Sequence, residues 1–279
     1  MESTTGYKED LEKLEIHLLL EALYSWYGFD YRNYAYSSIR RRIWHRVHAE
    51  KLTTISGLHE RVLHDPACFK RLLADFSINV TEMFRDPSFF ADFREKVVPL
   101  LRTYPSIRIW HAGCSTGEEV YSMAILLKEE GLYEKTKIYA TDINTEVLKV
   151  AKSGLYPMEP MRKYTNNYIQ TGGKKAFSDY YHVIGNKVQF DSSLLKNVVF
   201  AQHNLVTDGS FNEFNVILCR NVMIYFNKTL QNMVHDLFYN SLCMFGVIGL
   251  GDKETITYTK HSDRYESISE RQKIYKKIK

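Results

Sequence analysis

The stretch that most constrains the fold of this chain is residues 107–130. It opens with an apolar, partly β-branched run, passes through the small residues 112–117, and continues into a helical pattern with apolar residues at Tyr121, Ala124, Ile125 and Leu127. This order predicts a strand, a tight turn and a helix. In an α/β sheet such a turn lies at the carboxyl end of a strand, where a ligand can approach the backbone and the helix N-terminus. We therefore expect a small, nucleotide-like ligand at this turn.

Composition allows an ordinary globular protein of one or two domains, since the chain has 279 residues and 44% of them are hydrophobic. The four cysteines show no metal-ligand spacing, which predicts reduced thiols, a cytoplasmic location and no metal. The start of the chain lacks a signal-peptide pattern, and no apolar run approaches the roughly 20 residues that span a bilayer, so no membrane insertion is expected. A net charge of +4 is too mild to indicate nucleic acid.

Residues 1–77 are predicted to form a small helical domain, because apolar residues recur there every three or four positions. Between residues 31 and 49 the chain has five arginines and no acid. If Ser37 or Ser38 caps a helix in this segment, Ile39, Ile43 and Val47 line its buried face. The arginines then form either a solvated basic face or a docking surface for an acidic partner, and the residues alone leave both open.

Residues 78–92 form a predicted linker, a loop followed by a helix that starts near Pro87. Its polar residues could be capping groups or one wall of a site. Residues 93–279 form the second predicted domain, in which strands and helices alternate from Ile107 onward; this predicts a mostly parallel sheet with helices on its faces. Residues 157–197 interrupt this alternation and are predicted to add a helix and a small antiparallel sheet, with a turn at Gly185 and Asn186.

Polar residues follow the predicted strands at the ends where a nucleoside would bind, namely Asp142, Asn204 and Asn221. An acid after the second strand commonly binds ribose hydroxyls, although Asp142 could instead cap the following helix. The glycines of the first turn, Gly113 and Gly117, do not form a dinucleotide fingerprint, and no G-K-[ST] sequence occurs. Acids at the start of the next helix would repel a pyrophosphate but attract the ammonium and sulfonium groups of S-adenosylmethionine.

Four segments in this order resemble the signature segments of the chemotaxis receptor methyltransferases, the CheR family: INVTEMFRD (78–86), AGCSTGEEVYSMA (112–124), ATDINTEVLKVAKSGLY (140–156) and CRNVMIYF (219–226). One departure is Val120, where the family usually has proline. The resemblance implies a Rossmann-like class I methyltransferase sheet, with a small N-terminal helical domain and an inserted antiparallel β-subdomain.

The resemblance also implies site residues. It assigns the binding of S-adenosylmethionine, and of its product S-adenosylhomocysteine, to Asn79, Thr81, Arg85, Glu119, Asp142, Asn204, Leu205, Arg220 and Asn221. In that assignment Asp142 holds the ribose and Glu119 lies near the methionine part. Arg85 and Tyr225 are expected to border the methyl group and orient the substrate.

The family methylates glutamate side chains on the cytoplasmic helices of chemoreceptors, so the resemblance implies adaptation in chemotaxis signalling and a receptor as partner. Because those helices are acidic, the expected docking residues are Arg40, Arg41, Arg42 and Arg46. Members of the family that bind a receptor C-terminal peptide have a glycine- and proline-containing loop. The corresponding residues 172–184 contain no proline and form a longer segment, which favours a peptide-independent enzyme.

Two other functions are compatible with a sheet of this kind. A nucleic-acid methyltransferase would usually carry an Asn/Asp-Pro-Pro-aromatic segment after the fourth strand, and residues 219–226 lack both prolines. A non-catalytic module with the same fold would retain cofactor binding without turnover, but the glycines, the acids and Tyr225 are all present.

Overall fold

The computed structural model describes residues 2–77 and 80–279, with side chains from residue 6 onward. These residues divide into two compact units. The helical unit contains the N-terminal residues up to 77 and also residues 225–231, whereas the sheet unit contains residues 80–224 and 232–279. A short segment from late in the sequence therefore belongs to the helical unit.

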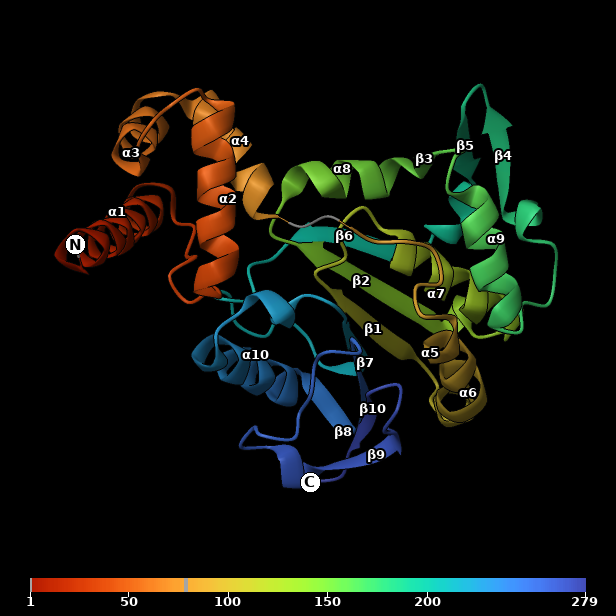
Figure 1. Ribbon diagram of the computed structural model, residues 1–279. Coiled ribbons are helices and arrows are strands. Elements are labelled where there is room, and N and C mark those ends of the chain that lie inside the picture. The colour runs from red at the N-terminus through yellow and green to blue at the C-terminus, as the bar shows by residue number, and fades with distance from the viewer. Residues whose placement is uncertain (1, 78–79) are drawn as a thin grey trace. The chain divides into compact units, whose positions relative to one another are not determined.

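The helical unit is built from α1 (Glu2–Tyr27), α2 (Tyr36–Ala49), α3 (Ile55–His64) and α4 (Pro66–Phe76) (Figure 1). The side chains of Thr54 and Asp65 cap α3 and α4 by accepting backbone N–H groups. α2 begins earlier than expected, because the carbonyl of Ala35 already accepts the amide of Ser38 at 3.0 Å. Neither Ser37 nor Ser38 is its cap, which corrects the sequence-based expectation.

The core of this unit follows the predicted pattern. Ile39, Ile43 and Val47 of α2 are fully buried, as expected from their spacing. They pack with apolar residues from all four helices and from the loop after α1. Tyr31 in that loop lies edge-on to Phe76 at the end of α4, with ring centroids 4.7 Å apart.

The main sheet of the sheet unit has the strand order β6-β2-β1-β7-β8-β10-β9. The first five strands in that order are parallel, which confirms the predicted mostly parallel sheet, and β10 runs antiparallel to both of its neighbours, β8 and β9. The strands are β1 (Ile107–Ala112), β2 (Thr136–Asp142), β6 (Val198–Gln202), β7 (Phe214–Cys219), β8 (Leu242–Leu250), β9 (Tyr265–Ser269) and β10 (Ile274–Lys277). Most residues of β1 and β7 and residues 246–250 of β8 are buried, because both faces of these central strands are covered there.

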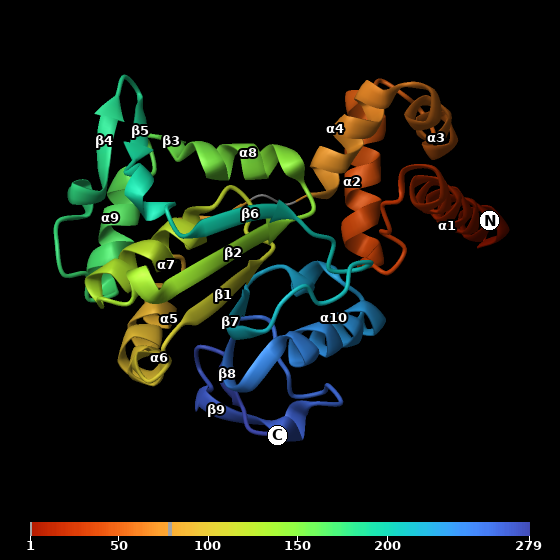
Figure 2. The ribbon, with the colours of Figure 1, turned by 180° about the vertical axis from the view of Figure 1, so that it is seen from behind.

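The remaining helices are α5 (Pro87–Asp92), α6 (Val98–Arg102), α7 (Glu118–Glu129), α8 (Thr145–Ser153), α9 (Met161–Gln170) and α10 (Lys228–Ser241). The predicted helix start at Pro87 is confirmed. A π-helical turn, Phe93–Val97, joins α5 to α6. α8 lies along β2 and β6 (Figure 2). None of the described helices is both long enough and apolar enough to cross a membrane.

The predicted insertion contains α9 and a small antiparallel sheet (Figure 1). The order of this sheet is β3-β5-β4, with β3 (Leu155–Pro157), β4 (Tyr181–Ile184) and β5 (Lys187–Phe190). Gly185 turns the β4–β5 hairpin with a positive φ of 61°. The sheet starts at Leu155, slightly before the expected boundary at residue 157.

Candidate active site

The turn between β1 and α7 is held in a conformation that requires its glycines. Gly113 and Gly117 have φ values of 78° and 93°. A Cβ added to Gly113 would lie 2.5 Å from Cγ2 of Val222, and one added to Gly117 would lie 2.8 Å from Cβ of Ala151. The two glycines therefore allow the loop after β7 and helix α8 to pack closely against this turn. They also leave room for a ligand to approach the backbone.

Asp142, at the end of β2, fixes this turn through backbone hydrogen bonds. Its Oδ2 accepts the amide of Ser115 and its Oδ1 accepts the amide of Asn144, both at 2.9 Å. Burial raises the pKa of Asp142, although these hydrogen bonds oppose the shift. The cap of α8 is Asn144, whose side chain accepts the amide of Glu146 at 2.9 Å. Asp142 is therefore not the helix cap. Its carboxylate lies at the end of β2 and fixes the neighbouring turn.

Glu119, in the first turn of α7, is the centre of a buried ionic cluster. Its Oε1 accepts Nδ1–H of His111 and its Oε2 accepts Nη1–H of Arg220, both at 2.9 Å. Burial favours the neutral acid, but the hydrogen bond from His111 and the charge of Arg220 outweigh it and lower the pKa of Glu119 to about 2. Glu119 is therefore a carboxylate at every physiological pH. A carboxylate oxygen has two lone pairs, so the group can still accept an ammonium donor.

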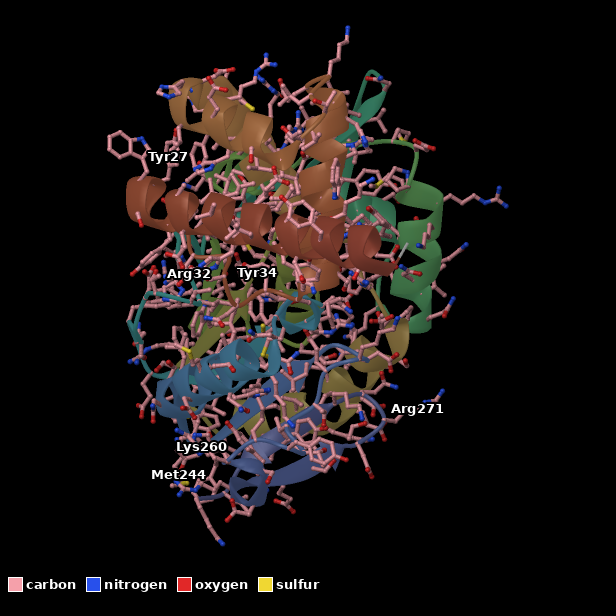
Figure 3. The ribbon with its side chains drawn as sticks, turned by 60° about the vertical axis from the view of Figure 1, so that its left-hand side comes forward. Tyr27, Arg32, Tyr34, Met244, Lys260 and Arg271 are labelled. Atoms are coloured by element: carbon pink, nitrogen blue, oxygen red, sulfur yellow. The ribbon has the colours of Figure 1, made fainter. Side chains whose placement is uncertain are left out.

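Arg220 links this cluster to the residues that precede α5. Its Nη2 donates to Asp86 at 2.7 Å and to the carbonyl of Arg85 at 3.1 Å, and its guanidinium lies 4.1 Å from the ring centre of Phe89. The side chain of Arg220 is only 2% exposed. It also lines a cavity of about 180 Å³ together with Phe89, Leu250 and Arg271. Figure 3 labels Arg271, which lies in the turn between β9 and β10.

Within the sheet unit, the buried residues of segment 80–86 hydrogen-bond to α7 and α9. The amide of Phe84 donates to Oγ of Ser122 at 2.8 Å, and Nδ2 of Asn167 donates to the carbonyl of Met83 at 3.0 Å. Arg85 follows these anchors, is half-buried, and donates to the carbonyl of Val80 at 3.0 Å. Thr81 is also half-buried. The predicted cofactor residue Asn79 lies outside the described residues.

The loop after β7 contains the predicted residue Asn221, in a left-handed conformation with φ of 61°. This loop is held by Glu254, which the sequence analysis missed. The carboxylate of Glu254 accepts four backbone amides, those of Asn221 at 3.0 Å, Val222 at 2.9 Å, Met223 at 2.8 Å and Gly251 at 2.6 Å. Burial raises the pKa of Glu254. Glu254 could have been predicted from its position four residues after β8, because acids that follow a strand lie at the same edge of the sheet as Asp142.

The other predicted residue pair, Asn204 and Leu205, follows β6 and is half-buried. Oδ1 of Asn204 accepts the amide of Val206 at 3.0 Å, and its own amide donates to Asp208 at 2.8 Å. The Asn204 side chain thus closes the turn that positions Leu205. β6 pairs with β2, and Gln202 at the end of β6 lies beside Asp142. Asn204 and Leu205 therefore follow β6 at the same edge of the sheet as Asp142.

The sheet unit supplies donors and acceptors suited to S-adenosylmethionine. The carboxylates of Glu119 and Asp142 are hydrogen-bond acceptors of the kind that ammonium groups and ribose hydroxyls need. Oγ of Ser115 and Oδ1 of Asn221 are buried, and the described part of the protein gives neither a hydrogen-bond partner. Both atoms are therefore free to bind a polar ligand at this edge of the sheet.

Tyr225 belongs to the helical unit. Its carbonyl accepts the amide of Ala35 at 2.8 Å, and the next residue, Phe226, forms an antiparallel bridge with Tyr34, which Figure 3 labels. The guanidinium of Arg42 lies 5.1 Å from the ring centre of Tyr225. Arg42 and the α1–α2 loop therefore fix the position of Tyr225.

The predicted basic face of α2 is only partly available to a partner. Arg40 pairs with Glu12 at 2.6 Å, and Arg46 pairs with Asp75 at 2.7 Å and with Glu50. Arg42 is buried and donates to the carbonyl of Phe76. Arg40 and Arg41 are both exposed, but of the four only Arg41 forms no ion pair within the described residues. Acids from α1 and α4 neutralise a surface that looked uniformly basic in the sequence.

Comparison with known proteins identifies the family. The model of the CheR methyltransferase SAM binding domain matches residues 79–274, and that of the CheR methyltransferase all-alpha domain matches residues 14–77. A Pseudomonas putida protein named methyltransferase Cher3 is 53% identical over 264 residues, which cover 95% of this chain and 97% of that protein.

More distant relatives agree with this match. Proteins of Listeria monocytogenes and Borreliella burgdorferi, both named chemotaxis protein methyltransferase, are 29% and 34% identical to this chain. The two alignments cover 82% and 68% of this chain, and 85% and 69% of the relatives. The chain therefore belongs to the CheR family of methyltransferases, and its cofactor is S-adenosylmethionine.

Proposed function

We propose that this enzyme transfers a methyl group from S-adenosylmethionine to glutamate side chains on the cytoplasmic helices of chemoreceptors, giving glutamate methyl esters. Relatives named chemotaxis protein methyltransferase support the assignment to chemotaxis. The structural observation that carries the proposal is the pairing of Tyr225 with Arg42. Arg42 is a buried cation that has no carboxylate partner within the described residues, and its Nη2 is unpaired. A buried cation beside a phenol, with no carboxylate to balance its charge, suits an anionic substrate.

Binding of the cofactor is assigned to the sheet unit. Asp142 would accept the ribose hydroxyls, and Glu119 would accept the ammonium group. Arg220 keeps Glu119 ionised, and Glu254 holds the loop that presents Asn221. Thr81, Arg85, Asn204 and Leu205 complete the proposed set, together with Asn79. When bound, the cofactor supplies an electrophilic methyl group on a sulfonium.

The proposed reaction needs no general base. A glutamate side chain has an ordinary pKa of about 4.3 and is already a carboxylate at neutral pH. One carboxylate oxygen forms the new bond to the methyl carbon while the carbon–sulfur bond breaks and its electron pair stays on sulfur. Arg85 and Tyr225 are proposed to donate hydrogen bonds to the other oxygen, which orients the nucleophile without protonating it.

A transfer assay tests this proposal. The full chain is incubated with methyl-labelled S-adenosylmethionine and a panel of chemoreceptor cytoplasmic fragments. We expect label in at least one fragment, and none when its candidate glutamates are replaced by alanine. Matched replacement of exposed aspartates on the same helices should leave the labelling unchanged. Labelling that survives replacement of every glutamate would refute the assigned substrate.

A further inference from the structure

α1 has two apolar faces, and the helical unit covers only one of them. Ile16, Leu19, Leu20 and Leu23 are buried in the core of the unit. On the opposite side lies a second row, which we call the α1 stripe: Tyr7, Leu11, Leu14 and Leu18. These four side chains are between 43% and 69% exposed. Figure 3 views the helical unit with α1 in front.

The spacing of the α1 stripe is that of a helix-pairing seam. Its intervals are four, three and four residues, which place all four side chains along one line of the helix. A solvent-facing helix normally carries polar residues on this side. Apolar residues that recur at this spacing on an exposed helix indicate a second helix packed against them.

The polar side chains beside the α1 stripe indicate which helix packs against it. Lys8 and Glu15 flank it on one side, and Asp10 and His17 flank it on the other. If α1 packs antiparallel against α1 of another copy, Leu11 meets Leu14 and Tyr7 meets Leu18. Lys8 then lies opposite Glu15 of the second copy, and Asp10 lies opposite His17. Because two-fold symmetry repeats each contact, both favourable pairs form twice.

A parallel arrangement is disfavoured by the same residues. It would place Asp10 of one copy opposite Glu15 of the other, so that like charges meet twice. The contact from Lys13 to Asp10, at 3.2 Å within one helix, is an exposed pair that a partner can readily replace. We propose that this protein self-associates through the α1 stripe as an antiparallel, two-fold symmetric dimer.

The seam is short, so the dimer is expected to be weak compared with obligate dimers, which bury roughly 2,000 Å² or more. Sedimentation equilibrium of the full chain, extended to millimolar concentration, should show a monomer–dimer equilibrium. Leu14→Glu should raise the dissociation constant at least about tenfold, because it buries a charge in the seam. The matched control Tyr258→Glu alters a side chain that is 79% exposed in the sheet unit and should leave the constant unchanged.

A charge exchange tests the identity of the partner. Lys8→Glu alone should weaken association, because two glutamates then face each other, and adding Glu15→Lys should restore it. Glu15 also accepts hydrogen bonds from Ser56, so thermal melting must show that each variant remains folded. A chain that stays monomeric throughout, a dimer indifferent to Leu14→Glu, or a double variant without recovery would each overturn the proposal.

Discussion

Arg220 at the end of β7 and Glu119 at the start of α7 are 101 positions apart in the sequence, yet their side chains are joined by a hydrogen bond of 2.9 Å. This pair ties the loop after one parallel strand to the turn after its neighbour. It also fixes the charge of Glu119, whose pKa is about 2. The site thus contains a permanent carboxylate balanced by a buried guanidinium.

Replacing Glu119 by glutamine should destabilise the protein in a pH-dependent way. The folded pKa of about 2 lies below the ordinary value of 4.5, so the carboxylate stabilises the fold fully above pH 4.5 and loses that effect as the pH falls toward 2. We expect Glu119→Gln to lower the free energy of unfolding by about 3 kcal/mol at neutral pH and by about half as much near pH 3. Urea unfolding at both pH values measures this, and a pH-independent difference would contradict it.

Glu254→Ala should loosen the loop after β7. The change leaves four buried amides without an acceptor, so we expect a loss of roughly 2–4 kcal/mol in unfolding free energy and a weaker affinity for S-adenosylhomocysteine. Calorimetric titration and urea unfolding measure the two effects. The control Asp263→Ala removes an exposed acid away from this loop and should change neither.

Asp142→Asn should weaken both the turn after β1 and cofactor binding. The amide can accept only through one oxygen, so one of the two backbone amides, that of Ser115 or that of Asn144, loses its acceptor. We expect the free energy of unfolding to fall by roughly 1–3 kcal/mol and the dissociation constant for S-adenosylhomocysteine to rise about tenfold or more. In the parent protein burial raises the pKa of Asp142. Affinity should therefore fall on acidification, beginning at a pH above the ordinary range for aspartate. Asp179→Asn, an exposed control, should bind like the parent.

Tyr225→Phe and Arg85→Ala should each reduce kcat about tenfold or more, because each removes one proposed donor to the substrate carboxylate. Affinity for S-adenosylhomocysteine should change little in Tyr225→Phe. The control Tyr258→Phe alters an exposed phenol and should retain full turnover. Near-normal methylation by both variants would remove Arg85 and Tyr225 from the catalytic residues.

Arg41 and Arg42 should respond differently to substitution, although they are adjacent. Arg41→Glu changes an exposed, unpaired charge, so we expect a higher KM for the receptor fragment and a weaker dependence on salt. Arg42→Gln removes a buried cation beside Tyr225, so kcat and the melting temperature should both fall. Steady-state kinetics at low and high salt distinguish the two variants. Identical effects of Arg41→Glu and Arg42→Gln would contradict the different roles assigned to the two arginines.

Much of the fold could be predicted because local patterns agree with it. The alternation of strand and helix gave the parallel sheet, Pro87 marked the start of α5, and the spacing of Ile39, Ile43 and Val47 gave the buried face of α2. The start of α2 was missed because the carbonyl of Ala35 accepts the amides of Ser38 and Ile39, whereas no serine side chain caps the helix.

The features that could not be predicted depend on contacts distant in sequence. Arg40 and Arg46 looked free in the sequence because their partners, Glu12 and Asp75, lie on other helices. Glu254 contributes only through backbone amides that the fold brings to it. The regular leucines of α1 predicted a helix, but periodicity alone does not show that Leu11, Leu14 and Leu18 face solvent.

The central claim, methyl ester formation on receptor glutamates, is tested most directly by the chemistry of the product. A receptor fragment methylated by the full chain is digested and analysed by tandem mass spectrometry before and after mild base. We predict a single methyl group on glutamate that is released as methanol by base, since esters hydrolyse under these conditions. A base-stable methyl group on lysine, arginine or another residue would contradict the claim.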